Sequence, residues 1–110
     1  MAGIANLSID AGASFSSDVD VVNDDGTAFD LTDYTVTAKM SKGYSTNYEK
    51  VNFTVIKYPL EGIVTIELSA TTTSQLEEGR WVYDVKASHN SDSTVTRLVE
   101  GIITVNPAVT

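Results

Sequence analysis

The side chains that could do acid–base or nucleophilic chemistry are few in this sequence. There is no cysteine, and His89 is the only histidine. His89 opens the polar run 89–93, a composition typical of a surface turn. A Ser-His-Asp triad needs a histidine held by an acid and close to a nucleophile, and a histidine in an exposed turn does not meet that need. We therefore predict no catalytic residue and no enzymatic activity.

Motifs for metals, phosphates and paired acids are also missing or weak. One histidine without cysteine does not make a zinc site, and the seven glycines form neither GxGxxG nor GxxxxGK[ST]. Glu77 and Glu78 are adjacent along the chain and diverge in space, which does not suit two-carboxylate catalysis. We expect no cofactor.

Calcium is the one metal that needs a closer look, because it binds six to eight oxygens. Six aspartates lie within 16 residues, but their spacing does not match an EF-hand loop. They are more simply outward strand residues and turn residues, so we predict no metal site. The six are Asp18, Asp20, Asp24, Asp25, Asp30 and Asp33.

Three tyrosines could form an aromatic platform for a sugar or a protein. Tyr44 and Tyr48 lie in the polar stretch 41–50, which we expect to be the longest exposed loop, and Tyr58 follows. Binding residues concentrate on such loops. The alternative is that these rings cover one end of the core.

The charge excludes several classes of partner. Fifteen acidic and seven basic residues give a net charge of −8. Nucleic-acid backbones and anionic membrane surfaces attract proteins with clustered Lys and Arg, so we expect neither as a partner.

The N-terminus has no signal-peptide pattern and no stretch is apolar enough to span a membrane. We expect synthesis in the cytoplasm, without export by the secretory route.

The element that organises the chain is the alternating run 81–87. Trp81, Tyr83, Val85 and Ala87 form one apolar face, as in a strand with one buried side. The run enters from a turn at Gly79, leaves through the polar run 89–93 and continues into the long run 94–105, so we predict a central hairpin. The predicted core comprises Trp81, Tyr83, Val85, Phe53, Ile66, Leu68, Val99 and Ile103.

Similar alternation recurs along the whole chain. Short runs separated by turn residues predict seven or eight strands, with one helical turn within 70–78 that begins at a threonine N-cap among 71–73. We predict one all-β domain over residues 1–110, an immunoglobulin-like β-sandwich, with residues 1–5 and 107–110 as tails.

The last strand departs from strict alternation. Val95, Val99 and Ile103 share one face, whereas Leu98 and Ile102 fall on the other. One interpretation is a bulge near Gly101 that exchanges the faces within the monomer. The other is a subunit contact, because exposed apolar strips mark interfaces. Leu98, Ile102, Tyr44 and Tyr48 are the candidate interface residues.

Four segments occur in the order 29–38 (FDLTDYTVTA), 62–69 (GIVTIELS), 79–85 (GRWVYDV) and 97–105 (RLVEGIITV), the last followed by Pro107. In this order they resemble small structural proteins of tailed-phage particles of the marine phage and cyanophage type. Together they are similar to the immunoglobulin-like domain of phage baseplate upper proteins.

The resemblance implies a non-enzymatic virion component on tail, baseplate, neck or capsid. Its partners would be other virion proteins and further copies of itself, in a symmetric array or homo-oligomer. The alternative is a module that binds host-surface glycans through the loop tyrosines.

Overall fold

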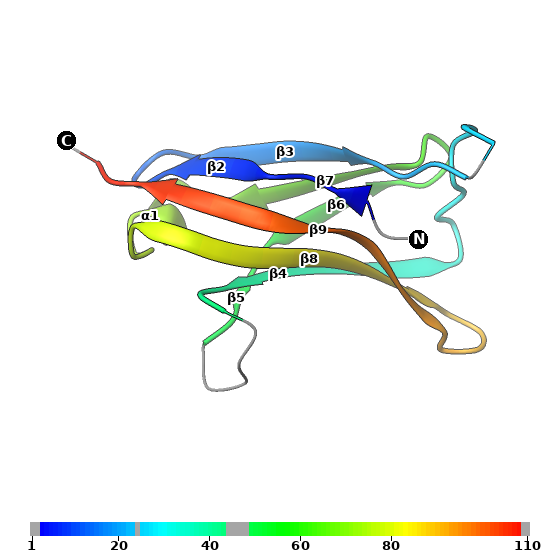
Figure 1. Ribbon diagram of the computed structural model, residues 1–110. Helices are drawn as coiled ribbons and strands as arrows, with labels where there is room; N and C mark the ends of the chain where they lie inside the picture. The colour runs from blue at the N-terminus through cyan, green and yellow to red at the C-terminus, as the bar shows by residue number, and fades with distance from the viewer. Residues whose placement is uncertain (1–2, 24, 44–48, 109–110) are drawn as a thin grey trace.

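The computed structural model describes residues 3–23, 25–43 and 49–108, and these form a two-layer β-sandwich with one helical turn (Figure 1). The sequence predicts seven or eight strands, whereas the described residues form nine, two of them only two residues long. The elements are β1 (Gly3–Ile4), β2 (Leu7–Asp10), β3 (Phe15–Asp20), β4 (Tyr34–Ser41), β5 (Val51–Asn52), β6 (Thr54–Tyr58), β7 (Ile63–Leu68), α1 (Ala70–Thr73), β8 (Gly79–His89) and β9 (Val95–Asn106).

The strand order identifies the fold. One sheet runs β1-β9-β8-β4-β5, with β2 also paired to β9, and the other runs β3-β7-β6. The N-terminal strands β1 and β2 pair parallel to the last strand, and all other pairs are antiparallel. Each sheet therefore combines strands from both halves of the chain, in a β-sandwich of two mainly antiparallel sheets. The chain is an immunoglobulin-like β-sandwich, as the sequence predicts.

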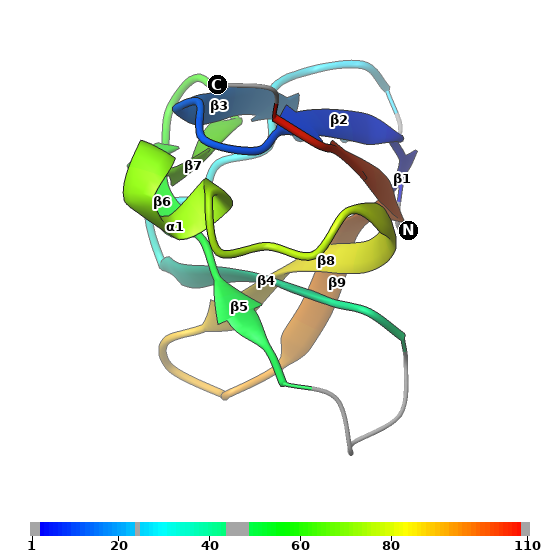
Figure 2. The same cartoon turned by 90° about the vertical axis from the view of Figure 1, so that its left-hand side faces the viewer.

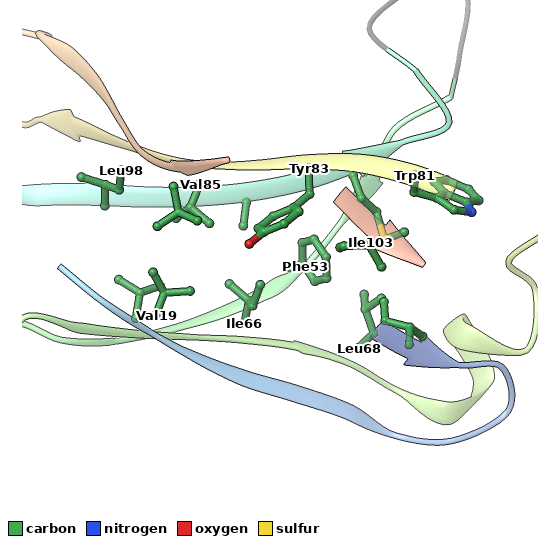
Figure 3. Packing of buried hydrophobic residues seen from close by; sticks show 14 of the residues in the cluster. Val19, Phe53, Ile66, Leu68, Trp81, Tyr83, Val85, Leu98 and Ile103 are labelled. Carbon is green, nitrogen blue, oxygen red and sulfur yellow. The ribbon is translucent and has the colours of Figure 1, made fainter. Parts of the chain in front are cut away.

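The core lies between the two sheets, and Figure 3 shows its side chains pointing toward one another from both layers. All eight predicted core residues are buried: Trp81, Tyr83, Val85, Phe53, Ile66, Leu68, Val99 and Ile103. This part of the prediction is confirmed. It was reliable because a strand with one buried face must place every second side chain inward.

Phe53 marks the point where the chain changes sheets. Val51 pairs with Met40 of β4, but Val55 pairs with Ile66 of β7 in the other sheet. Between them the Phe53 amide donates to the carbonyl of Ala38 at 3.0 Å. The sequence predicts one continuous strand here, since alternation records which side chains are buried and not which strand is the neighbour.

The irregularity in β9 is a bulge, but it lies three residues before Gly101. Val85 pairs with Val99 and Lys86 pairs with Arg97, so Leu98 is the extra residue. Both Leu98 and Val99 consequently point into the core, and Leu98 is only 8% exposed. Leu98 as an interface residue is therefore wrong, because a bulge lets two successive side chains share one face.

The prediction that residues 1–5 form a tail is wrong for residues 3–5. Gly3 and Ile4 pair with Val99 and Glu100 of β9. The carbonyl of Ala5 accepts a 2.6 Å hydrogen bond from the Tyr83 hydroxyl. Nothing in the local sequence of this short segment indicates that it pairs with the edge of a strand far along the chain.

The corner between β7 and β8 holds α1 and the tryptophan. Ser69, not a threonine, caps the helix: its Oγ accepts from the Thr72 amide at 3.2 Å. Trp81 then donates its indole N–H to the carbonyl of Glu77 at 2.9 Å, which ties the start of β8 back to the corner. Figure 2 looks along the sandwich from this end and shows α1 between the two layers. Within the described ranges, no helix has the length and apolarity required to cross a membrane.

Candidate interaction surfaces

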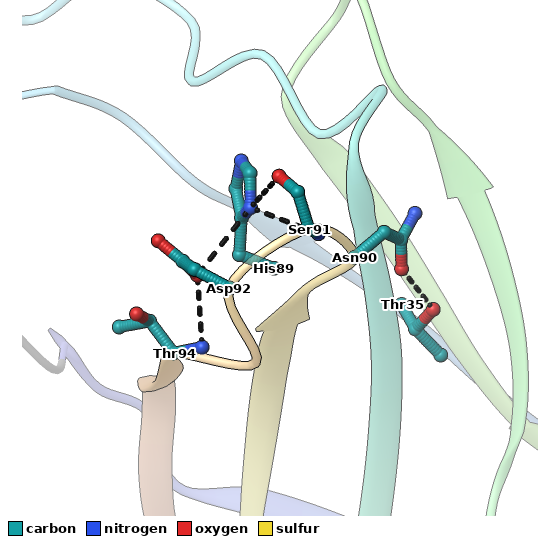
Figure 4. A network of polar contacts seen from close by, with 6 residues as sticks. All are labelled: Thr35, His89, Asn90, Ser91, Asp92 and Thr94. Carbon is teal, nitrogen blue, oxygen red and sulfur yellow. Dashed lines mark hydrogen bonds and ion pairs between the residues drawn. The ribbon is translucent and has the colours of Figure 1, made fainter.

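His89 lies at the tip of the β8–β9 hairpin, within a network that closes the turn (Figure 4). Its Nδ1 lies 3.0 Å from the Ser91 hydroxyl and 3.5 Å from an Asp92 carboxylate oxygen. A triad needs the nucleophile and the acid on different ring nitrogens. Here both contact the same nitrogen, so the three side chains cannot relay a proton from serine to acid.

Two of the six aspartates considered as calcium ligands, Asp25 and Asp30, have local structural roles. Asp25 and Asp30 each accept the amide of the threonine two residues later, at 3.0 and 2.9 Å, and Asp92 does the same at 3.0 Å. This Asp-x-Thr pattern is an Asx-turn, in which a side chain replaces a backbone carbonyl. Hydrogen bonds from the threonine hydroxyl and amide lower the pKa of Asp25 and of Asp30.

The remaining acids of that set do not converge with them. Asp18 of β3 accepts a hydrogen bond from the Thr65 hydroxyl of β7 at 2.6 Å, on the outer side of the three-stranded sheet. Asp24 lies outside the described residues. Among residues 3–23, 25–43 and 49–108, no three acidic or histidine side chains gather as metal ligands would.

The tyrosine platform can be followed only in part. Tyr44 and Tyr48 lie outside the described residues. Tyr58 is 45% exposed and lies in β6, on the outer face of the three-stranded sheet.

Glu77 and Glu78 are exposed, and their described contacts are made by backbone carbonyls, to Trp81 and to Lys42.

Ile102 is half-buried and paired with Val82. Both side chains point away from the core because their neighbours along the strands, Trp81 and Ile103, point into it. They form a small apolar patch on the outer face of the six-stranded sheet. Of the two candidate interface residues that the structure describes, Leu98 is in the core and Ile102 lies on an accessible sheet face.

Beside this patch lies a concavity of about 450 Å³ on the same face, formed over β4, β8 and β9. Four of the seven basic residues of the chain line it, together with two acids. The charged lining residues are Lys39, Lys50, Lys86, Arg97, Asp84 and Glu100.

Ion pairs within the concavity involve one of its cations. Arg97 lies 3.5 Å from the Asp84 carboxylate and 3.7 Å from that of Glu100. Lys39, Lys50 and Lys86 are exposed, and the described residues place no carboxylate within ion-pair distance of their ammonium groups. The concavity therefore offers three lysines without an ion-pair partner among the described residues, in a chain whose net charge is −8.

Sequence reasoning did not single out these lysines. The available signal was their position: Lys39 and Lys86 occupy outward positions of two strands whose inward positions are apolar. Whether those strands were neighbours could not be deduced from alternation alone. Only the pairing of Lys39 with Asp84 and of Lys86 with Thr37 and Arg97 brings the charges together.

Comparisons with known proteins add little beyond the fold. No protein-family model matches the sequence, and no curated protein matches it. Among solved structures, the chain is similar to the N-terminal Ig1-2 module of the Drosophila receptor protein tyrosine phosphatase DLAR. The sequence identity is 16%, the TM-score is 0.49, and the likeness covers 94% of this chain. The chain spans about half (46%) of that structure.

Proposed function

We propose that this chain is a structural component of a bacteriophage particle, belonging to the tail, baseplate, neck or capsid-associated proteins, and that it is not an enzyme. It acts through protein–protein contacts, its partners are other virion proteins and copies of itself, and it is located in the virion. The observation that carries the proposal is the resemblance of four ordered segments to phage baseplate immunoglobulin-like domains. Fold analogy alone would not support it, because immunoglobulin-like sandwiches serve many functions.

The positions of the four segments are compatible with this proposal. Residues 29–38 lead into β4 and form its first half, and residues 62–69 contain β7. Residues 79–85 form the first half of β8, and residues 97–105 form most of β9. They supply core residues and the outward charges Asp84, Arg97 and Glu100. A sheet backbone held by hydrogen bonds on both sides suits a docking module, because the backbone of the binding surface needs no further ordering.

The test is incorporation into particles. Phage particles would be purified on a density gradient from a lysed culture that carries the native coding sequence, then labelled with a gold-conjugated antibody against the chain. We expect label at one fixed site of the particle and a constant ratio of the chain to the major capsid protein. A non-structural protein of the same genome is the control. If the chain stays with the soluble fraction and away from particles, the proposal is wrong.

The glycan-binding alternative predicts a different result. Purified chain would then bind host-surface glycans, and Tyr44→Ala or Tyr48→Ala would abolish that binding while the chain stays folded. Saturable binding of this kind, combined with absence from purified particles, would replace the structural role with a glycan-binding one.

A further inference from the structure

The two outer faces of the sandwich differ in charge. We call the outward side of β4, β8 and β9 the basic face. Arg97 is paired there with Asp84 and Glu100, whereas Lys39, Lys86 and, at the start of β8, Arg80 have no carboxylate at ion-pair distance among the described residues. The pairing of Lys86 with Thr37, two residues from Lys39, makes the two lysines diagonal neighbours across β4 and β8. Diagonal neighbours lie roughly 7–8 Å apart, close enough to act on one partner surface.

The outward side of β3, β7 and β6 is the acidic face. Asp18 and Asp20 of β3 are exposed there, and Glu67 of β7 is half-buried beside Ser16. None of the described outward positions of these three strands is basic. The lysine of β6, Lys57, donates instead to the carbonyl of Tyr34 at 2.6 Å.

Each face also carries apolar side chains beside its charges. On the basic face these are the half-buried Val82 and Ile102. On the acidic face they are Ile56 and Tyr58 of β6, which are 37% and 45% exposed. Isolated exposed apolar residues are common. Here each face has apolar side chains beside its charges, so a contact between the two faces can combine opposite charges with apolar groups.

We propose that the basic face of one copy docks on the acidic face of a second copy. The contact is head-to-tail: Lys39 and Lys86 face Asp18 and Glu67 of the next molecule, with the apolar groups beside them. Pairing two basic faces would place the unpaired lysines opposite one another, and pairing two acidic faces would place carboxylates opposite one another, so like-charge repulsion opposes both. Opposite faces are the pairing that electrostatic complementarity favours.

The size of the faces and the symmetry of the contact bear on assembly. The domain measures 43 × 28 × 21 Å, so a broad face can approach the roughly 800 Å² per partner of a standard interface. Because the two faces lie on opposite sides of one domain, each copy can bind two others. Such heterologous contacts build rings or open filaments and not closed two-fold dimers. This partner rests on the proposed function, since a particle assembles many copies of one chain.

The experiment uses two variants that each block one face. Lys39→Glu/Lys86→Glu reverses the charge at two positions of the basic face, and Asp18→Asn/Glu67→Gln removes two of the three carboxylates of the acidic face. All four substitutions are at surface positions, and thermal melts by circular dichroism confirm the fold of each variant. Asp33→Asn/Glu77→Gln is the matched control for the second variant, because it makes the same charge change at exposed positions outside both faces.

Sedimentation velocity at low and high salt is the readout. For the wild-type chain and the control we expect a weight-average mass that rises above 11.8 kDa with concentration at about 50 mM salt and returns toward the monomer near 500 mM. Each face variant alone stays at 11.8 kDa. Their mixture forms a 1:1 complex and nothing larger, since only one intact basic face and one intact acidic face remain.

Three results would overturn the inference. A wild-type chain that is monomeric up to millimolar concentration has no such contact. Dimers of the acidic-face variant alone would indicate pairing of basic faces. A mixture of the two variants that stays monomeric would show that the faces do not bind each other. These outcomes are independent of antibody labelling on particles, so failure of this contact and failure of the virion role are separate results.

Discussion

At the scale of single residues, Gly101 and Tyr83 show how the N-terminal segment is held. A Cβ on Gly101 would lie 2.0 Å from the Ala5 carbonyl oxygen and 3.1 Å from the Tyr83 ring. That same carbonyl accepts the Tyr83 hydroxyl at 2.6 Å. The absence of a side chain at Gly101 therefore lets the first residues lie against β9, and Tyr83 fastens them there.

Gly101→Ala should destabilise the fold by about 2 kcal/mol, because backbone must move to relieve the overlap. The matched control is Gly3→Ala, whose Cβ would meet its nearest neighbour, the Leu98 carbonyl oxygen, at an ordinary 3.9 Å. We expect the control to change stability by less than about 0.5 kcal/mol. Urea unfolding of both variants measures the difference, and equal effects would contradict this explanation.

Tyr83 should also make stability depend on alkaline pH. Burial raises the pKa of its hydroxyl above the ordinary value of 10.0. Because the pKa is higher in the folded state, the neutral Tyr83 hydroxyl contributes fully to stability below pH 10. This contribution is lost as the pH rises through the pKa of the folded state. Tyr83→Phe removes this group, so its unfolding free energy should fall less steeply between about pH 10 and 12 than that of the wild type. Parallel curves would show that Tyr83 ionisation is not linked to folding.

At the scale of elements, β9 is both a core strand and a surface strand. The bulge at Leu98 turns two successive residues inward, and the strand then resumes alternation, with Ile102 on the outer face. Leu98 and Ile102, four positions apart, thus lie on opposite faces of the strand. Alternation predicts the same face for both. That prediction is wrong because a bulge shifts the alternation by one residue, and no particular residue type marks it in the sequence.

A pair of matched substitutions on β9 separates these environments. Leu98→Asp puts a charge into the core and should cost about 3 kcal/mol or more, enough to unfold a domain of this size under mild denaturant. Ile102→Asp should cost about 1 kcal/mol, because its side chain is half-exposed. Thermal melts of the two variants test this, and similar melting temperatures would contradict the bulge.

At the scale of the whole molecule, charge is segregated onto different parts of the surface. Lysines gather on one sheet, acids occupy the other sheet, and the Asx-turns of Asp25, Asp30 and Asp92 lie in the β3–β4 and β8–β9 connections. These connections meet at one end of the sandwich, where the amide of Asn90 donates to the carbonyl of Asp33. The net charge of −8 alone does not reveal this separation.

The Asx-turns should make stability depend on acidic pH. Hydrogen bonds lower the pKa of all three carboxyls from 3.8, so their contribution is complete above pH 3.8 and is lost as the pH falls through the folded values. Asp25→Asn/Asp30→Asn/Asp92→Asn keeps an acceptor in each turn but removes the titration. Its stability in urea should therefore fall less between pH 5 and about pH 2 than that of the wild type. An equally large loss of stability in the wild type and the triple variant over this pH range would contradict the explanation.

The sequence by itself determined the fold class, the buried faces of the central strands and all eight predicted core residues. It could do so because side-chain alternation and turn residues act locally, within a few positions of the chain. The Asp-x-Thr turns carry an equally local signal, since their hydrogen bonds span two residues, but we did not predict them.

Only the tertiary structure decided which strands are neighbours, where β9 bulges, where the N-terminal segment docks and how the basic residues gather. Tyr83 and Ala5 are 78 positions apart, and Lys39 and Lys86 are brought together by a strand pairing between distant segments. Such contacts depend on register and on the choice of partner strand. Local pattern does not encode either, because every strand edge offers the same backbone donors and acceptors.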